Sequence, residues 1–201
     1  MRHRHAISVP PRAERGTSSV EFAAVVVLFF VMVLGITDFA RALWQWNLAA
    51  RATQVGVRAA AVQDPAALNV RHLDGTLTAP IGEAVPAAAL TPNPTLCTRD
   101  GCGAALSALD PALLDGAAFA RIVAPMRAVN RRIDAGKVIL EYRHVGLGLA
   151  GNPEGPDIDP LITVRLRELR FEFLGIGFLG LPAIELPDFR ATLSAEDGDS
   201  A

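Results

Sequence analysis

The chain has 201 residues, which leaves room for one membrane segment and one domain of roughly 120 to 150 residues. Its formal net charge is −2 and it has no basic stripe interleaved with aromatic residues, so the composition does not indicate a nucleic-acid partner. Gly-rich phosphate loops, Gly-x-Ser-x-Gly, His-Glu-x-x-His and clustered Cys/His sets do not occur in the sequence. We therefore expect a protein that is not an enzyme and that binds no cofactor.

Residues 1–16 are basic, contain Pro10-Pro11 and have no hydrophobic periodicity, so they are typical of a leader without folded structure. A cytoplasmic tail that is kept in the mature protein is the alternative. The positive-inside rule predicts a cytoplasmic N-terminus and export of everything after about residue 38. The arginines that precede the apolar run are Arg2, Arg4, Arg12 and Arg15, against the single acid Glu14.

The segment from Phe22 to Thr37 has no charged side chain, which predicts a membrane helix over residues 17–40. As a helix the charge-free segment spans about 24 Å, somewhat less than a hydrocarbon core of about 30 Å. The helical pattern continues without proline as an amphipathic exported helix over 41–63, so we expect one helix from Thr17 to Gln63. Its apolar stripe is Phe39, Leu43, Trp46, Ala50, Thr53, Val57 and Ala60.

A second stripe of small residues, Ala42, Ala49 and Gly56, repeats every seven residues along this helix. Small side chains let two helix backbones come close together. The stripe therefore favours packing of another helix against this face, although alanine is common throughout this part of the chain.

Residues 64–110 are rich in Pro, Gly, Ala and Thr and are predicted to be a loop region with short elements. Cys97 and Cys102 lie there, with four residues between them. In an exported domain, oxidising conditions favour a disulfide between them. The alternatives are free thiols or metal-binding thiols, but a zinc site needs two more ligands, and His72 and His144 lie far away in the sequence.

Residues 111–194 are predicted to hold a helix followed by strands. Asp110 as N-cap and Pro111 as first helical residue open the helix, which continues at helical spacing to Ile133. Pro125 should kink or split it, because proline removes one backbone donor. Gly136 should end it.

Alternating apolar residues predict one strand over 138–143 and another that begins near Ile162. The apolar phase shifts by one residue at Arg167-Glu168, which predicts a β-bulge or a break into two strands. A last strand is expected around Phe189 to Leu193, before an acidic, disordered tail over 195–201. The predicted fold is thus α+β: a long N-terminal helix, transmembrane and then periplasmic, followed by a small domain with a short helical region and an antiparallel sheet.

Other chemistry-bearing residues are assigned structural roles. Glu154, Asp157 and Asp159 offer hard oxygen ligands for Ca²⁺, but they lack the Gly-bearing twelve-residue loop, so a solvated loop without metal is favoured. Tyr142 and His144 are interpreted as ordinary core and surface residues.

The start of the chain resembles a known family. The residues that carry the resemblance are Arg15-Gly16, Glu21-Phe22-Ala23, Gly35 to Arg41 and Ala49 to Ala60. Over the first 63 residues they are similar to the TadE-like family of tight-adherence (Flp) pilus proteins, a class of minor pseudopilins. The chain departs from the family pattern at Ala40, where glycine is usual, and at Val55-Gly56-Val57, where Glu-Gly-Ala is common.

The resemblance implies that 1–16 is a class III prepilin-type leader, which prepilin peptidase removes between Gly16 and Thr17. Glu21 then becomes residue five of the mature chain, followed by Phe22, and its charge can be met by the new α-amine of an adjacent subunit. Implied partners are other pilus or pseudopilin subunits, the tight-adherence inner-membrane machinery and membrane lipid. The expected location is the bacterial inner membrane, with possible incorporation in the pilus. In the alternative interpretation, Glu21 only marks the membrane edge.

Two further classes of protein remain open. Ala40-Arg41-Ala42 fits a conventional signal peptidase site, which would release a secreted soluble periplasmic protein beginning at Leu43. The second class is a membrane-tethered periplasmic enzyme or binding module. It would need a convergent polar pocket, and no motif in the sequence indicates one.

Overall fold

A computed structural model describes residues 14–68, 70, 82–85, 93–148, 159–175, 177 and 180–195, with side chains from residue 18 onward. The predicted leader up to residue 13, Glu154 and Asp157 of the acidic loop, and the tail after Ala195 lie outside the described residues. The chain forms two compact units, and each is described by itself. The first comprises residues 1–42 and 172–183, and the second comprises 43–171 and 184–201.

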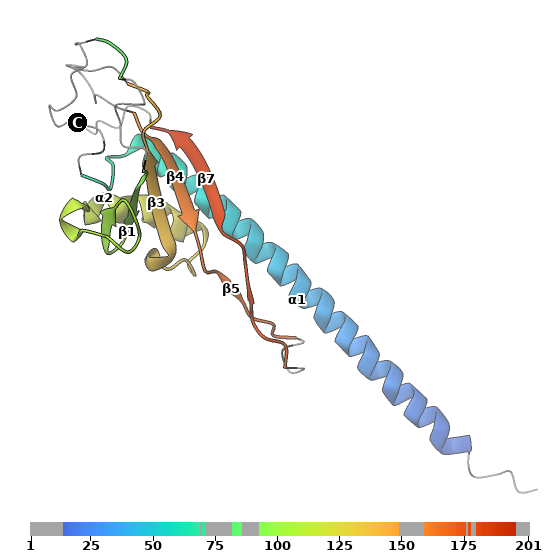
Figure 1. Ribbon diagram of the computed structural model, residues 1–201. Coiled ribbons are helices and arrows are strands. Elements are labelled where there is room, and N and C mark those ends of the chain that lie inside the picture. Colours follow the sequence, from blue (N-terminus) through green and yellow to red (C-terminus); the bar gives the residue numbers. More distant parts are fainter. Residues whose placement is uncertain are drawn as a thin grey trace, which may run out of the picture. The chain divides into compact units, whose positions relative to one another are not determined.

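Helix α1 (Glu14–Val62) is continuous, and both units contain part of it (Figure 1). It begins three residues before the predicted start at Thr17 and ends one residue before the predicted end at Gln63. No proline interrupts it, since the next one is Pro65. The prediction of a single long N-terminal helix is confirmed, whereas residues 14–16, predicted to belong to an unfolded leader, form its first turn.

The second unit contains a five-stranded antiparallel sheet, in the order β2-β1-β3-β4-β7 (Figure 1). Two further short strands pair with each other, so the predicted α+β class with an antiparallel sheet is confirmed. The strands are β1 (Thr95–Thr98), β2 (Gly101–Gly103), β3 (Val138–Arg143), β4 (Leu161–Leu166), β5 (Arg170–Phe171), β6 (Ile184–Glu185) and β7 (Phe189–Ser194).

The hairpin formed by β1 and β2 lies in a region that was predicted to be mainly loop. Its strands have only four and three residues, too short to show an alternating pattern. Thr98 pairs with Gly101, so Arg99 and Asp100 form a two-residue turn. Asp100-Gly101 is displaced by one residue from these two turn positions, so the usual Asp-Gly hairpin signal does not apply to this turn.

The helical part of 111–133 is broken, contrary to the prediction of one helix from Pro111. A short 3₁₀ helix η2 (Pro111–Leu113), with Asp110 as the predicted N-cap, is followed by α2 (Gly116–Val129). Between them Leu114 is extended and forms a bridge with Ala67, which draws it out of a helical conformation. Asp115 then caps α2 by accepting hydrogen bonds from the backbone N–H groups of Ala117 and Ala118.

Pro125 lies inside α2 and does not split it, so that part of the prediction is wrong. Helix α2 already ends at the cap residue Asn130, and the expected terminator Gly136 belongs instead to the 3₁₀ helix η3 (Ala135–Lys137). Asp134 caps η3 by accepting a hydrogen bond from the N–H of Gly136.

The core of the second unit lies between one face of the sheet and two helices, α2 and the C-terminal half of α1. The two helices approach closely at Gly56 of α1, because a Cβ atom there would lie only 2.6 Å from Sδ of Met126. Of the predicted small-residue stripe, Gly56 is thus the residue on which α2 packs. The apolar stripe is only partly buried: Phe39, Leu43 and Trp46 are exposed, whereas Thr53, Val57 and Ala60 are buried.

The strand patterns agree largely with the prediction. In β4 the side chains of Ile162, Val164 and Leu166 are buried as expected. The phase shift produces a break into two strands, and Glu168 lies in the gap with a φ of 57°, a left-handed conformation. In β3, however, Ile139 is buried together with Val138 and Leu140, so the burial does not alternate strictly along this strand.

Candidate membrane and assembly segment

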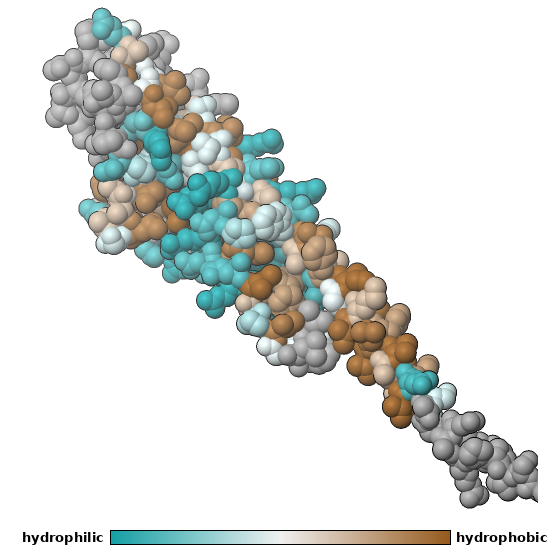
Figure 2. Space-filling model, turned by 45° about the vertical axis from the view of Figure 1, so that its right-hand side comes forward, coloured by the Kyte–Doolittle hydropathy of each residue, from teal (hydrophilic) through white to brown (hydrophobic). Residues whose placement is uncertain are grey.

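Most side chains of the apolar run of α1 are exposed, and none from Val20 to Thr37 is fully buried. None of an 18-residue stretch of it is buried, and this is the one helix among the described residues that is long and apolar enough to cross a membrane. Figure 2 shows these hydrophobic side chains along the helix. The exposed ones include Val25, Leu28, Phe29, Met32 and Ile36. A soluble helix hides one apolar face, so a run that is exposed all round is suited to lipid or to other apolar helices.

The predicted cleavage site, Gly16 and Thr17, lies in the first turn of α1. The amide groups of a first turn lack intrahelical acceptors, and helix ends fray readily. The bond between these two residues therefore lies where the helix opens most readily.

The predicted assembly residues Glu21 and Phe22 follow within the next turn of α1. Both are exposed, Phe22 to 70%. Within the described part of the chain no ion pair involves Glu21. Its carboxylate is accessible to a cation from another molecule.

Asp38, which closes the charge-free run, has a role that the sequence did not reveal. It is 1% exposed, and its carboxylate accepts hydrogen bonds from the backbone N–H of Leu174 at 3.2 Å and of Gly175 at 2.8 Å. Arg41, one turn further along α1, donates to the same carboxylate at 2.7 Å. Within the first unit, Asp38 thus fixes residues 174–175 to the helix by charge-assisted hydrogen bonds.

Gly175 is required at this contact. A Cβ atom there would lie 2.9 Å from Cβ of Leu34 and 3.0 Å from its carbonyl oxygen. The position is therefore too tight for any side chain. The sequence signal was the Gly-rich apolar stretch from Leu174 to Pro182, but nothing in it indicated Asp38 as the partner.

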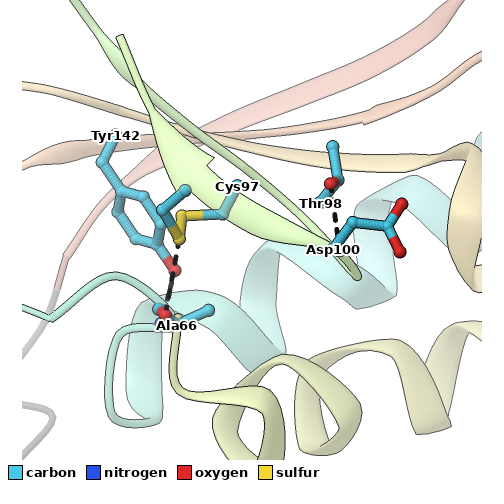
Figure 3. The surroundings of a disulfide bond; sticks show 6 residues. Ala66, Cys97, Thr98, Asp100 and Tyr142 are labelled. Atoms are coloured by element: carbon cyan, nitrogen blue, oxygen red, sulfur yellow. Dashed lines mark hydrogen bonds between the residues drawn. A yellow bond between two sulfur atoms is a disulfide. The ribbon is translucent and has the colours of Figure 1, made fainter. Parts of the chain in front are cut away.

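Cys97 and Cys102 form a disulfide, as predicted, between paired positions of β1 and β2. Both sulfur atoms are completely buried, beside the segment that follows α1 (Figure 3). The hydroxyl of Tyr142 accepts a hydrogen bond from the N–H of Ala66 at 2.9 Å, and Sγ of Cys102 lies 3.7 Å from the carbonyl oxygen of Ala66. A disulfide sulfur carries no hydrogen, so the second approach is a contact. The bridge therefore braces the end of α1 against the sheet.

Two residues that were assigned structural roles can now be placed. Tyr142 is fully buried in the core. His144 is half-buried, and its Nδ1 has no hydrogen-bond partner within the described residues. Burial lowers the pKa of His144 below its usual value, because the charged form is poorly solvated there.

A hollow of about 230 Å³ lies beside α1 in the second unit. Its lining residues are Trp44, Asn47, Leu48 and Arg51. This set offers no nucleophile paired with a base, so the hollow does not indicate a catalytic site.

Residues 16–58 match the model of a protein family described as TadE-like protein. The matched range begins at Gly16, includes the apolar run and Asp38, and ends within the part of α1 that packs on α2. No curated protein and no solved structure matches the chain.

Proposed function

We propose, from the match of residues 16–58 to the TadE-like family model, that the chain is a minor pseudopilin-like component of a tight-adherence (Flp) pilus. Its role is structural: it assembles with other pilus subunits and with the inner-membrane machinery. The observation that carries the proposal is the long helix α1, whose exposed, charge-free run follows Gly16 and Glu21 at the spacing of a prepilin.

The arrangement of α1 supports a role in assembly. Its N-terminal part has apolar side chains on all sides, whereas its C-terminal part is held in the core of the second unit. A subunit built in this way is anchored in the inner membrane through the first part and keeps its folded domain on the periplasmic side. The arginines before the run support a cytoplasmic N-terminus.

Processing by prepilin peptidase between Gly16 and Thr17 is part of the proposal. Cleavage creates a positively charged α-amine at Thr17, in the same apolar environment as Glu21. An unpaired carboxylate is costly within a bilayer, so pairing Glu21 with the amine of a neighbouring subunit favours side-by-side association. The exposed position of Glu21 is compatible with such pairing.

The experiment compares Gly16→Ala, Glu21→Ala and the matched control Ser18→Ala in the native host. Mass spectrometry of the mature N-terminus and fractionation into sheared pili and inner membrane are the readouts. We expect Gly16→Ala to remain an unprocessed precursor, Glu21→Ala to be poorly assembled, and Ser18→Ala to behave as wild type. A mature N-terminus at Thr17 in the Gly16 variant would contradict the proposed cleavage.

Conventional signal peptidase cleavage after Ala42 is the competing proposal. That cut would remove Asp38, whose carboxylate fixes Leu174 and Gly175, and would leave these backbone donors without it. The same cut would remove Leu34, against which Gly175 lies, so this connection would lose its whole attachment to the helix. A mature N-terminus at Leu43 would nevertheless decide in favour of the secreted form.

A further inference from the structure

We propose that the described residues of the connection between β5 and β6, 173–175, 177 and 180–183, enter the membrane–water interface on the exported side, beside α1. We call these residues the interfacial loop. The partner is lipid, and the inference rests on the proposed anchoring of α1 in the membrane. Three features of the loop favour a bilayer as its partner: its composition, its attachment to α1 and the hydrogen bonds of its backbone N–H groups.

The interfacial loop has an unusual composition for a connection between strands. No charged residue occurs between Glu172 and Glu185. Leu174 is 72% exposed and Leu181 is 46% exposed. Exposed apolar side chains in a loop without charges are suited to an apolar partner. The apolar residues of the interfacial loop are Phe173, Leu174, Leu181, Pro182 and Ala183.

The interfacial loop is attached to α1 at the end of the apolar run. Asp38, the first charged residue after the apolar run, accepts the hydrogen bonds from Leu174 and Gly175. Gly175 also lies directly against Leu34, inside the run. The apolar surface of the loop is therefore continuous with that of the helix, at the end of the run that faces the exported side.

The bilayer is the occupant that fits this position. The charge-free segment of α1 spans about 24 Å and is therefore shorter than a hydrocarbon core of about 30 Å. Its exported end thus lies close to the membrane–water interface. The apolar side chains of the interfacial loop add hydrophobic surface at the end where the apolar run of the helix stops. Interfacial segments bury their apolar side chains about 5 to 10 Å deep, at the boundary between headgroups and acyl chains.

The polar groups of the interfacial loop are arranged for such an environment. Backbone N–H groups that leave water need an acceptor within the protein. The N–H groups of Leu174 and Gly175 have Asp38, and the N–H of Gly180 donates to the carbonyl of Gly177 at 3.0 Å. Glu172 and Glu185 mark the two ends of the charge-free stretch.

The test places a polarity-sensitive fluorophore on single introduced cysteines of the full-length chain in phosphatidylethanolamine–phosphatidylglycerol vesicles. Leu174→Cys and Leu181→Cys report on the loop. Val27→Cys reports on the middle of the run, and Arg190→Cys, on the exposed side of β7, is the water-facing control. The native cysteines do not react because they form the disulfide. Quenching by lipids with a spin label high or low on the acyl chain gives the depth of each fluorophore.

We expect labels at 174 and 181 to be quenched more by the shallow spin label than by the deep one, with Arg190→Cys unquenched. Val27→Cys should show the opposite preference. Unquenched loop labels together with a quenched Val27 label would overturn the interfacial loop and leave the anchoring intact. If the Val27 label is also unquenched, the membrane anchoring itself is wrong and the inference falls with it.

Discussion

The carboxylate of Asp38 accepts a hydrogen bond from the backbone N–H of Gly175, which lies 137 residues further along the chain, at 2.8 Å. Asp38 is on α1, where the apolar run ends, and Gly175 belongs to the connection between β5 and β6. One buried acid therefore determines where the interfacial loop is attached to the helix. The second bond, from Leu174, and the ion pair with Arg41 keep the carboxylate fully satisfied.

The substitution Asp38→Asn should release the interfacial loop from the helix. The amide offers one acceptor oxygen in place of two, so one of the two backbone donors loses its partner, at a cost of about 1 to 3 kcal/mol. Amide hydrogen exchange at Leu174 and Gly175 should accelerate by about tenfold or more. Asp64→Asn, which breaks an exposed ion pair with Arg121, is the control and should leave these amides unchanged. Unaltered exchange in Asp38→Asn would show that the loop is held by other contacts.

The substitution Gly56→Ala should destabilise the second unit by about 1 to 2 kcal/mol, because overpacking outweighs the gain in helix propensity. The added methyl would lie 2.6 Å from Sδ of Met126, so α1 and α2 must move apart or the methionine must change rotamer. Thermal unfolding in detergent micelles measures the effect. Gly35→Ala is the matched control on the same helix, where a Cβ atom meets nothing within 4 Å. A stabilised Gly56→Ala variant would contradict the close helix contact.

Replacing both cysteines by alanine should lower the free energy of unfolding by about 2 kcal/mol, the loop-closure entropy of so short a loop. Cys97 and Cys102 are only five positions apart, so the bridge restricts few conformations of the unfolded chain. Denaturant unfolding of the oxidised wild type and the double variant gives the difference. A much larger loss would mean that the bridge also holds the contact between Tyr142 and Ala66 in place.

The stability of the second unit should fall as the pH is lowered through the region below 6.5. Burial lowers the pKa of His144 in the folded state, so the folded protein binds fewer protons than the unfolded chain between the two pKa values. Unfolding is therefore favoured as His144 becomes charged, and above about pH 7 this residue adds no pH dependence. His144→Asn should flatten the slope in denaturant melts measured at several pH values. A slope unchanged by the substitution would assign it to other groups.

Long, periodic elements could be predicted from the sequence, because their side-chain patterns repeat often enough to identify them. Helix α1 and the strands around Val138, Ile162 and Phe189 are of this kind. The break near Glu168 could also be predicted, since a one-residue phase shift moves every later side chain to the opposite face.

Features that depend on distant partners could not be predicted. Leu114 is extended because it pairs with Ala67, a contact that no local pattern encodes. In the sequence, Asp38 could be identified only as the charge that ends a membrane segment. Its role as a hydrogen-bond acceptor could not be predicted, because it depends on backbone groups far away in the chain. In the candidate segment the motif residues Gly16, Glu21 and Phe22 could be located from the sequence, but the role of Asp38 could not.

The strand order β2-β1-β3-β4-β7 has a consequence for how the sheet can form while the chain emerges. After the first hairpin, β3 joins the sheet beside β1, and β4 and β7 are then added in chain order beside β3 and β4. A polypeptide that emerges N-terminus first can thus extend its sheet in one direction, with the newest strand always at the growing edge. The disulfide hairpin can close at the outset, and β7 completes the structure when the end of the chain arrives.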